Sequence, residues 1–248
     1  MEGAAMTDAT TVISALAPTA AGEFRIGRVF NRTVGVLSRN FPIYFAVAAL
    51  AAVPKAIVDK TSGGWQFLIF ILMAIAGPLA LAIMAQAAFT DMSGRPVSLS
   101  EAVRVVFRRF LPLLGLTICM GLAIFLGFLL LIVPGVILVI MWYVATPAFV
   151  IERLDISASM ARSSALTKGH RWGIFGMLIL LYISVAIVEV VIEHTLALTG
   201  STGLVTCGSL VWAGLSGAFG SVLAVAAYYD LRVAKEGIDT RQLAAVFE

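Results

Sequence analysis

The chain has 248 residues, of which 60% are hydrophobic and 12% are charged, and its mean hydropathy is +1.01. About a quarter of the residues of a typical soluble domain are charged, so this composition excludes an ordinary soluble protein. The formal net charge is +3, but the basic residues separate apolar runs and form no basic domain, which argues against a nucleic-acid-binding protein. The sequence therefore predicts an all-α polytopic membrane protein.

The N-terminal segment, residues 1–21, is rich in alanine and threonine and carries Glu2 and Asp8 before any basic residue. A secretory signal has a basic region followed by an apolar core, and this segment has neither. We expect it to be a disordered tail. Cys119 and Cys207 lie within or at the edge of apolar runs without a CxxC pair, so we expect them to pack as small apolar side chains.

Six apolar runs are each of the length that a membrane helix needs, which is roughly 20 residues. They cover residues 41–58, 65–90, 111–133, 134–151, 172–191 and 204–229. The uncharged Pro134-Gly135 pair is expected to turn the third span directly into the fourth. This division gives a six-span membrane domain at residues 22–233, followed by a cytoplasmic C-terminal tail at residues 234–248.

Amphipathic segments precede the first, third and fifth spans. Residues 22–40 place four arginines on one helical face and apolar residues on another, a pattern typical of a helix that lies in the membrane interface. Residues 98–110 begin with Ser98 and Glu101, which form the S-x-x-E pattern of a helix capping box. Residues 157–168 form a shorter segment of small residues. We expect all three to be surface helices on the cytoplasmic side.

Basic residues are distributed unequally between the two sides of this arrangement. Fifteen of the 17 lie on one side, and only Lys55 and Lys60 lie on the other. Short loops rich in lysine and arginine stay in the cytoplasm. The sequence therefore predicts that both termini are cytoplasmic.

The same order of elements occurs three times, as an amphipathic helix, an outgoing span and a returning span. Each returning span ends at an acid that a base follows within four residues. These exit charges are Asp91 with Arg95, Glu152 with Arg153, and Asp230 with Arg232. The pattern indicates a threefold internal repeat, which recurring hydropathy can also imitate.

Charged residues gather in the stretch that joins the fourth span to the fifth. They are Glu152, Arg153, Arg162, Lys168 and Arg171. Such a group can bind a lipid headgroup or another anion at the interface, or its members can set orientation and pair with one another. Both interpretations stay open here, although the second is the more common. We expect Glu152 to pair with Arg162 or Arg171 and to accept from backbone N–H groups at the start of the following helix.

Polar residues inside the spans allow two further hypotheses. Glu189, with the nearby Glu193 and His194, lacks the convergent third ligand that a metal or proton-relay site needs, so we expect a solvated helix end in which Glu189 pairs with Lys55. A mid-membrane cavity lined by Gln86, Thr146 or Tyr143 would favour a transporter, whereas solid packing there would favour an accessory protein.

One set of residues follows the pattern of a known family: Pro134, Gly135, Pro147, Glu152, Ser163, Ser164, Leu166, Thr167, Lys168, Gly169 and Trp172. Together with the segment from Tyr229 to Arg232, it resembles the glycerophosphoryl diester phosphodiesterase membrane domain and related bacterial integral membrane proteins. Some relatives join this domain to a soluble phosphodiesterase barrel. We expect no barrel here, because the sequence ends about 19 residues after the last span. The resemblance implies no catalytic residues in the membrane part.

The combined observations predict a non-enzymatic accessory or scaffold protein that organises lipids or partner proteins in the bacterial cytoplasmic membrane. The sequence shows no Ser-His-Asp order, no glycine-rich phosphate loop and no carboxylate pair at mid-membrane that would indicate an enzyme. We expect membrane lipids and other membrane proteins as partners, and neither a cofactor, a metal nor a nucleic acid. The alternative is a transporter or a lipid-translocating protein, which an internal repeat would permit.

Overall fold

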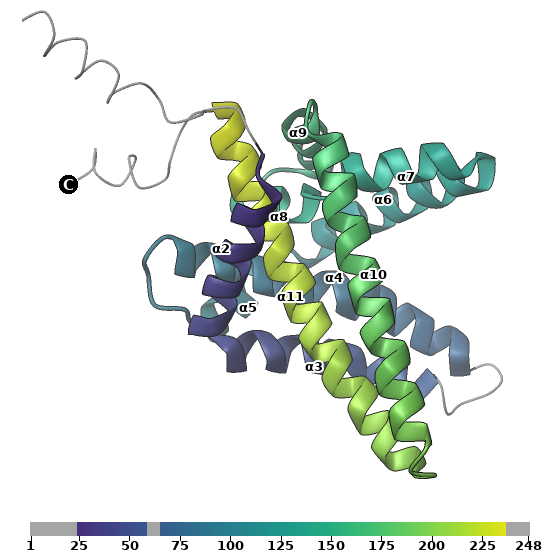
Figure 1. Ribbon diagram of the computed structural model, residues 1–248. Helices are drawn as coiled ribbons and strands as arrows, with labels where there is room; N and C mark the ends of the chain where they lie inside the picture. Colours follow the sequence, from purple (N-terminus) through teal and green to yellow (C-terminus); the bar gives the residue numbers. More distant parts are fainter. Residues whose placement is uncertain (1–23, 59–64, 237–248) are drawn as a thin grey trace, which may run out of the picture.

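A computed structural model describes residues 24–58 and 65–236, and this part of the chain is all-α (Figure 1). The predicted disordered tail at residues 1–21, the loop that carries Lys60 and most of the predicted C-terminal tail lie outside the described residues. The helices are α2 (Ile26–Arg39), α3 (Phe41–Val58), α4 (Trp65–Met92), α5 (Leu99–Phe107), α6 (Phe110–Leu130), α7 (Ile132–Met141), α8 (Ala145–Ile151), α9 (Ile156–Thr167), α10 (Arg171–Ala197) and α11 (Thr202–Glu236).

The prediction of a multi-pass membrane protein is confirmed by the length and hydropathy of these helices. Five segments of the described chain are long and apolar enough to cross a membrane: α4, α6, α10, α11 and Ile132–Ile151, which contains α7 and α8. The helices α2 and α3 meet the same description as a pair bent by 96°. The structure therefore supports five spans, or six when this bent pair counts as one.

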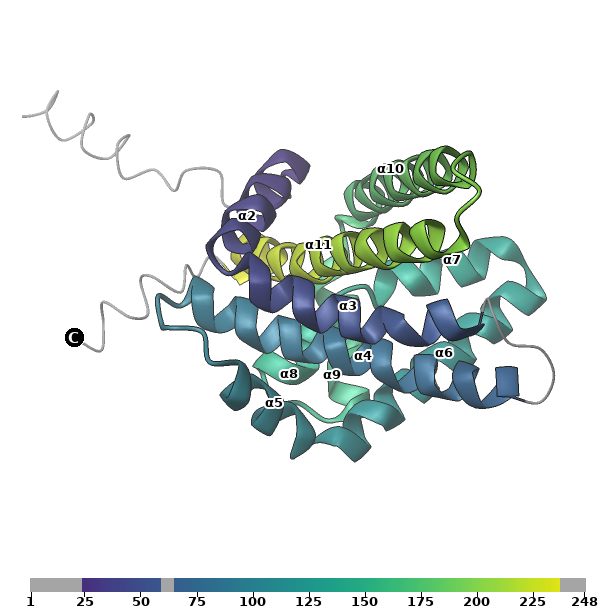
Figure 2. The ribbon, with the colours of Figure 1, turned by 90° about the horizontal axis from the view of Figure 1, so that it is seen from below.

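Helix α11 is the central element of the fold. Its 35 residues correspond to about 52 Å at 1.5 Å per residue, and it packs against α2, α3, α4 and α10 (Figures 1 and 2). One face places Ala218, Val222 and Val225 in a core with α3, α4 and α6. Another face places Leu223 and Ala227 in a second core with α10 and the fourth span. The two cores therefore share α11 as their common wall.

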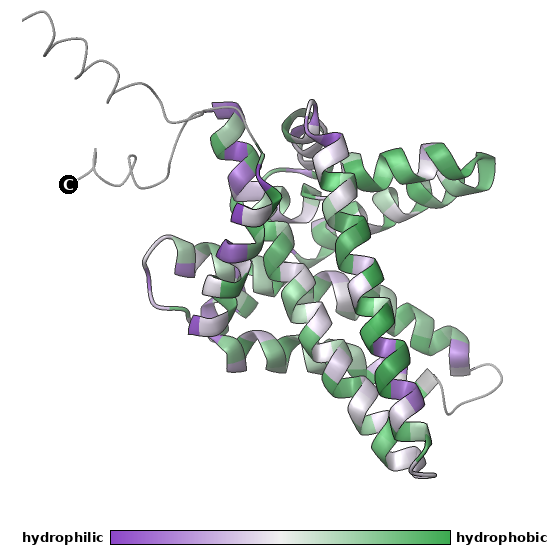
Figure 3. Cartoon of the chain, in the orientation of Figure 1, coloured by the Kyte–Doolittle hydropathy of each residue, from purple (hydrophilic) through white to green (hydrophobic). Residues whose placement is uncertain are grey.

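Three helical hairpins extend from this centre and diverge: α3 with α4, α6 with α7, and α10 with α11 (Figure 1). The far part of α6 and α7 is strongly apolar, whereas hydrophilic residues gather around α2, α5 and the end of α11, with a few more toward the tips of the other two hairpins (Figure 3). Large apolar side chains at the tip of the second hairpin, such as Leu130 and Ile132, are more than two-thirds exposed. Exposed apolar surface of this extent suits a protein whose solvent is lipid.

The fourth span is one membrane segment but two helices, which differs from the continuous run that we predicted. Helix α7 ends at Met141 and α8 begins at Ala145. At this break the carbonyl oxygen of Met141 accepts hydrogen bonds from Ser163 Oγ at 2.8 Å and Thr167 Oγ1 at 3.3 Å. Irregular backbone inside a membrane requires such partners, because lipid supplies none.

Helix α9 supplies those hydroxyl groups from a buried face, whereas Ser157, Ala161 and Ala165 on its other face are exposed, as a surface helix requires. Ser159, Ser163 and Leu166 share one face and are fully or almost fully buried. They pack α9 against α6, α7, α8 and α11. The small residues on this face allow the backbone of α9 to approach the neighbouring helices closely.

The turn between the third and fourth spans occurs at Leu131, in extended conformation with φ −164° and ψ 149°, and not at Pro134-Gly135. Pro134 lies in the first turn of α7, where its missing N–H costs nothing. Gly135 serves a different purpose, because a Cβ atom placed there would lie 2.5 Å from Phe128 Cγ. Glycine therefore allows α6 and α7 to pack closely.

The two other predicted amphipathic segments form helices. In α2 the buried residues Val29, Thr33 and Val36 lie on one face. In α5 the predicted N-cap is present, since the Oγ of Ser98 accepts from the backbone N–H of Glu101 at 3.4 Å. With α9, these helices complete the order of an amphipathic or small-residue helix followed by a hairpin, three times along the described chain.

Candidate functional site

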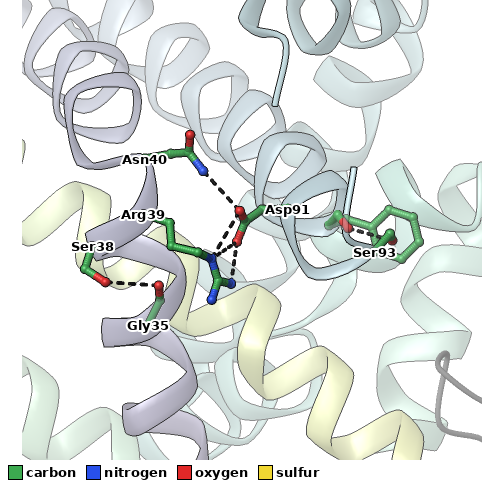
Figure 4. A network of polar contacts seen from close by, with 7 residues as sticks. Gly35, Ser38, Arg39, Asn40, Asp91 and Ser93 are labelled. Carbon is green, nitrogen blue, oxygen red and sulfur yellow. Dashed lines mark hydrogen bonds and ion pairs between the residues drawn. The ribbon is translucent and has the colours of Figure 1, made fainter. Parts of the chain in front are cut away.

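The acids that end the three returning spans do form ion pairs, but with arginines of other helices. Asp91, near the end of α4, holds the side chain of Arg39 from α2, with Nη2 to Oδ2 at 2.6 Å. Asn40 Nδ2 donates to the other carboxylate oxygen at 3.0 Å (Figure 4). Asp230 in α11 is only 2% exposed and pairs with Arg28 of α2 at 2.7 Å.

Glu152 is the third of these acids, and it lies at the centre of a larger group. Arg162 of α9 donates from Nε to both carboxylate oxygens, at 2.9 and 3.0 Å. The hydroxyl of Tyr228 in α11 donates to Oε1 at 2.5 Å. Arg162 also pairs through Nη2 with Glu236 at 2.5 Å, and Glu236 pairs with Arg232 at 2.9 Å. We call these five residues the Glu152 network.

The charges of the Glu152 network balance, since its two carboxylates pair with its two guanidinium groups. Burial lowers the pKa of the Arg162 guanidinium, but hydrogen bonds and the charges of Glu236 and Glu152 outweigh burial and leave the pKa above its ordinary value. Because every charge has a partner, the network ties the end of α8 and helix α9 to α11. It offers no unpaired cation to an anionic ligand.

The structure brings together only part of the charged group that we predicted between the fourth and fifth spans. Glu152 and Arg162 meet, whereas Arg153, Lys168 and Arg171 lie outside the Glu152 network. Sequence reasoning missed Tyr228 and Glu236 as partners. Both residues lie four positions from Arg232, and residues four apart share a helical face. This spacing could have identified them, but we expected the helix of the sixth span to end at residue 229.

A second polar group lines a groove of about 530 Å³ between the α10–α11 hairpin and the helices α3 and α4. Lys55 and Glu189 lie in its wall and pair at 2.6 Å, which confirms the predicted contact. Glu189 lies 17 residues beyond Trp172, and Trp212 lies 17 residues before Tyr229. At 1.5 Å per residue both are about 26 Å from the predicted cytoplasmic ends of their spans, so the charged end of the groove faces the far side of the membrane.

Two donors in the groove lack a hydrogen-bond partner. The hydroxyl of Tyr143, which lies in the break of the fourth span, and the indole Nε1 of Trp212 are both buried without a partner among the described residues. Buried donors are normally satisfied. The groove can therefore accept a molecule that carries hydrogen-bond acceptors between apolar parts.

The mid-membrane region thus combines the two arrangements that we expected to be alternatives. The groove begins at Glu189 near the far side and extends past Tyr143 to Ala224, about 8 Å from the predicted cytoplasmic end of its span. Beside it the protein is solid, because Val144, Ala148 and Leu223 are fully buried. Gln86 lines a different pocket, beside the ends of α4 and α8, and Thr146 is not among the residues that line the groove.

Comparisons of the chain with protein-family models, curated proteins and solved structures find no match. The resemblance to the glycerophosphoryl diester phosphodiesterase membrane domain therefore stays a prediction. Among the residues that the structure describes, no three histidine, cysteine, aspartate or glutamate side chains gather where they could hold a metal ion. The function has to be inferred from the groove, the ion pairs and the pockets.

Proposed function

We propose that this multi-pass membrane protein is a non-enzymatic accessory or scaffold protein that holds a membrane lipid in the groove beside α10. The observation that carries the proposal is the composition of the groove wall. It has an ion pair at its far end, unpartnered donors at Tyr143 and Trp212, and apolar side chains between them. Its volume lies in the range of about 300–1,000 Å³ that small-molecule sites occupy. A lipid places polar and apolar parts in the same order.

An adjoining pocket supports a lipid rather than a small polar solute. It has a volume of about 370 Å³, lies between α2, α10 and α11, and is lined by apolar side chains that include Phe30, Leu180 and Phe219. Trp212 and Ser216 line both spaces. An acyl chain can therefore occupy the apolar pocket while the ester carbonyls accept from Trp212 and Tyr143.

We further propose that the protein lies in a bacterial cytoplasmic membrane with both termini in the cytoplasm. This orientation rests on the unequal distribution of the basic residues. It places the charged end of the groove toward the outer side of the bilayer and the Glu152 network at the inner surface. A lipid whose headgroup contacts Lys55 and Glu189 then comes from the outer leaflet.

The groove can be filled without disturbing the protein, which provides the test. Gly77 of α4 lines the groove, and a Cβ atom there would meet nothing within 4 Å. Gly121 of α6 has equally open surroundings but does not line the groove. We expect Gly77→Leu to lose the lipid that native mass spectrometry detects on the purified protein, and Gly121→Leu to keep it. Equal lipid retention by the two variants would contradict the proposal.

Lipid translocation is a second candidate, because the groove reaches the broken fourth span. Discontinuous membrane helices at mid-membrane are a common feature of transporter binding sites. Translocation would require the packed region at Val144 and Leu223 to open. Proteoliposomes that contain a headgroup-labelled fluorescent lipid test this directly. Accelerated exchange between leaflets that Gly77→Leu abolishes would favour translocation over scaffolding.

The proposal also predicts that the purified protein does not hydrolyse glycerophosphodiesters. Release of glycerol phosphate from glycerophosphocholine, measured with and without added divalent metal, is the relevant assay. Metal-dependent turnover that persists through stringent purification and is lost in Glu189→Gln or Glu193→Gln would show that the protein is an enzyme.

A further inference from the structure

A separate pocket of about 380 Å³ lies where the ends of α4 and α8 meet α5, on the same side of the protein as the Glu152 network. Its polar lining includes Gln86, Ser93, Arg95, Glu101 and Arg153. Arg95 and Arg153 are the bases that follow the exit acids of the first two predicted repeats. We call it the exit-arginine pocket.

These two arginines are available because their neighbouring acids have other partners. Asp91 is held by Arg39 and Asn40, and Glu152 is held by the Glu152 network. Within the part of the chain that the structure describes, neither Arg95 nor Arg153 forms an ion pair. Two unpaired guanidinium groups therefore line one pocket.

The backbone at Arg153 is held in an unusual conformation. Its φ of +54° is the only positive value outside glycine among the described residues. Such strain persists only where the surroundings fix it, and it concentrates at functional sites. Here Arg109 fixes the next residue, because its Nη2 donates to the carbonyl of Leu154 at 2.7 Å while its guanidinium lies 4.6 Å from the ring centre of Phe149.

Hydrogen bonds also fix the backbone on the opposite wall of the pocket. Arg95 follows the turn at the end of α4, where its backbone N–H donates to the carbonyl of Thr90 at 3.2 Å. Ser93 Oγ donates to the carbonyl of Phe89 at 2.8 Å. The two arginines thus project from two fixed backbone segments, an arrangement that lowers the entropic cost of binding a ligand between them.

The lining identifies the chemical class of the ligand. Paired guanidinium groups match the oxygen atoms of a phosphate, to which arginine can donate two parallel hydrogen bonds. Glu101 would repel a simple anion but can accept from a hydroxyl or an ammonium group. We propose that the exit-arginine pocket binds a phosphate ester whose alcohol part carries such a donor. This site is distinct from the lipid groove and does not depend on it.

The ligand can be a soluble phosphate ester or the headgroup of a phospholipid in the adjacent leaflet. Phosphoethanolamine and phosphatidylethanolamine share the phosphate and the ammonium group, so they separate the two sources. Thermal unfolding of the detergent-purified protein is measured with each compound. A raised Tm with phosphoethanolamine identifies a soluble ligand, and a raised Tm with the lipid alone identifies a headgroup. No shift with either compound would overturn the proposal.

Three variants connect the shift to the pocket. We expect Arg95→Gln and Arg153→Gly to weaken binding by about tenfold or more, which corresponds to the loss of one hydrogen bond to a charged group. Arg104→Gln removes an exposed arginine of α5 outside the pocket and is expected to bind normally. Glycine tolerates a positive φ, so Arg153→Gly keeps the fold. Equal binding by all three variants would refute the assignment.

Glu101 and the groove supply two further controls. Phosphatidylcholine carries no N–H donor. We therefore expect the wild-type protein to bind phosphatidylcholine more weakly than phosphatidylethanolamine, and Glu101→Gln to bind the two lipids with equal, weak affinity. Gly77→Leu, which fills the groove, should leave the response to phosphoethanolamine unchanged. Failure of the groove proposal and failure of the pocket proposal can therefore be told apart.

Discussion

At the scale of single residues, Glu152 and Asp155 show how two nearby carboxylates take different roles. Glu152 ends α8 and its side chain is 18% exposed against an Arg162 side chain that is 25% exposed. Asp155 begins α9 as its N-cap, makes no side-chain capping bond and is exposed. The predicted pair of Glu152 with Arg162 is confirmed, but its second donor is Tyr228 instead of the backbone N–H groups that we expected.

We therefore expect Glu152→Ala to destabilise the protein far more than Asp155→Ala does. Removing Glu152 leaves Arg162 with one carboxylate partner instead of two and the Tyr228 hydroxyl without its acceptor, which should cost about 1–3 kcal/mol. An exposed carboxylate such as that of Asp155 contributes about 0–1 kcal/mol. Thermal unfolding of the two variants in the same detergent makes the comparison. Equal melting temperatures would show that the Glu152 network does not stabilise the fold.

Chain positions allowed some of these contacts to be predicted and concealed others. Lys55 and Glu189 were expected to meet because both lie near the far ends of their spans. The repeated order of exit acids and bases did not identify the partner of either charge. Asp230 and Arg232 lie two apart on α11, where such residues do not face each other. Each exit acid pairs with an arginine of another helix.

At the scale of elements, the broken fourth span depends on α9, which follows it in the chain. Hydropathy is continuous from Pro134 to Ile151, so no periodicity reveals the break at residues 142–144. The hydroxyl groups that complete it come from residues 22 and 26 positions after Met141. For the same reason the burial of one face of α9 could not be predicted, since small residues suit both a loosely held surface helix and a closely packed one.

Removing these hydroxyl groups tests the role of α9. We expect Ser163→Ala with Thr167→Ala to lower stability by about 1–3 kcal/mol, because the carbonyl of Met141 loses its partners in a region without water. Ser157→Ala changes an exposed serine of the same helix and should have little effect. Thermal unfolding and proteolysis between the fourth and fifth spans measure the difference. If the double variant and Ser157→Ala are equally stable, the hydroxyl bonds do not hold the break together.

At the scale of the whole molecule, composition and hydropathy were sufficient for the membrane class but not for the groove. The number of apolar runs determines how many segments can cross a membrane. The groove depends on the angle between the α10–α11 hairpin and its neighbours (Figure 2). That angle arises from packing of α11 against α2 and α3, which no pattern within a single span encodes. The first predicted span, residues 41–58, is the single helix α3, and its sharp bend from α2 falls at the predicted end of the amphipathic segment.

The orientation of the molecule can be tested by labelling single cysteines with a membrane-impermeant maleimide in intact cells. Fifteen of the 17 basic residues lie on one predicted side, and this distribution places Ser98 and Ala161 inside the cell and Thr199 outside. All three side chains are exposed, whereas Ser159 on the same surface segment is fully buried and would resist labelling on either side. The native residues Cys119 and Cys207 are exposed, so the prediction that they pack inside the protein is wrong. Both are first replaced by alanine.

We expect Thr199→Cys to react in intact cells, and Ser98→Cys and Ala161→Cys to react only after the membrane is permeabilised. Permeabilisation is the control that each introduced thiol is accessible. Reaction of Ala161→Cys in intact cells with protection of Thr199→Cys would invert the molecule and place the exit-arginine pocket outside. Reaction of both variants in intact cells would mean that α10 does not cross the membrane, because α10 alone separates these two positions. Only the expected pattern leaves the charged end of the groove toward the outer side of the bilayer and the Glu152 network at its inner surface.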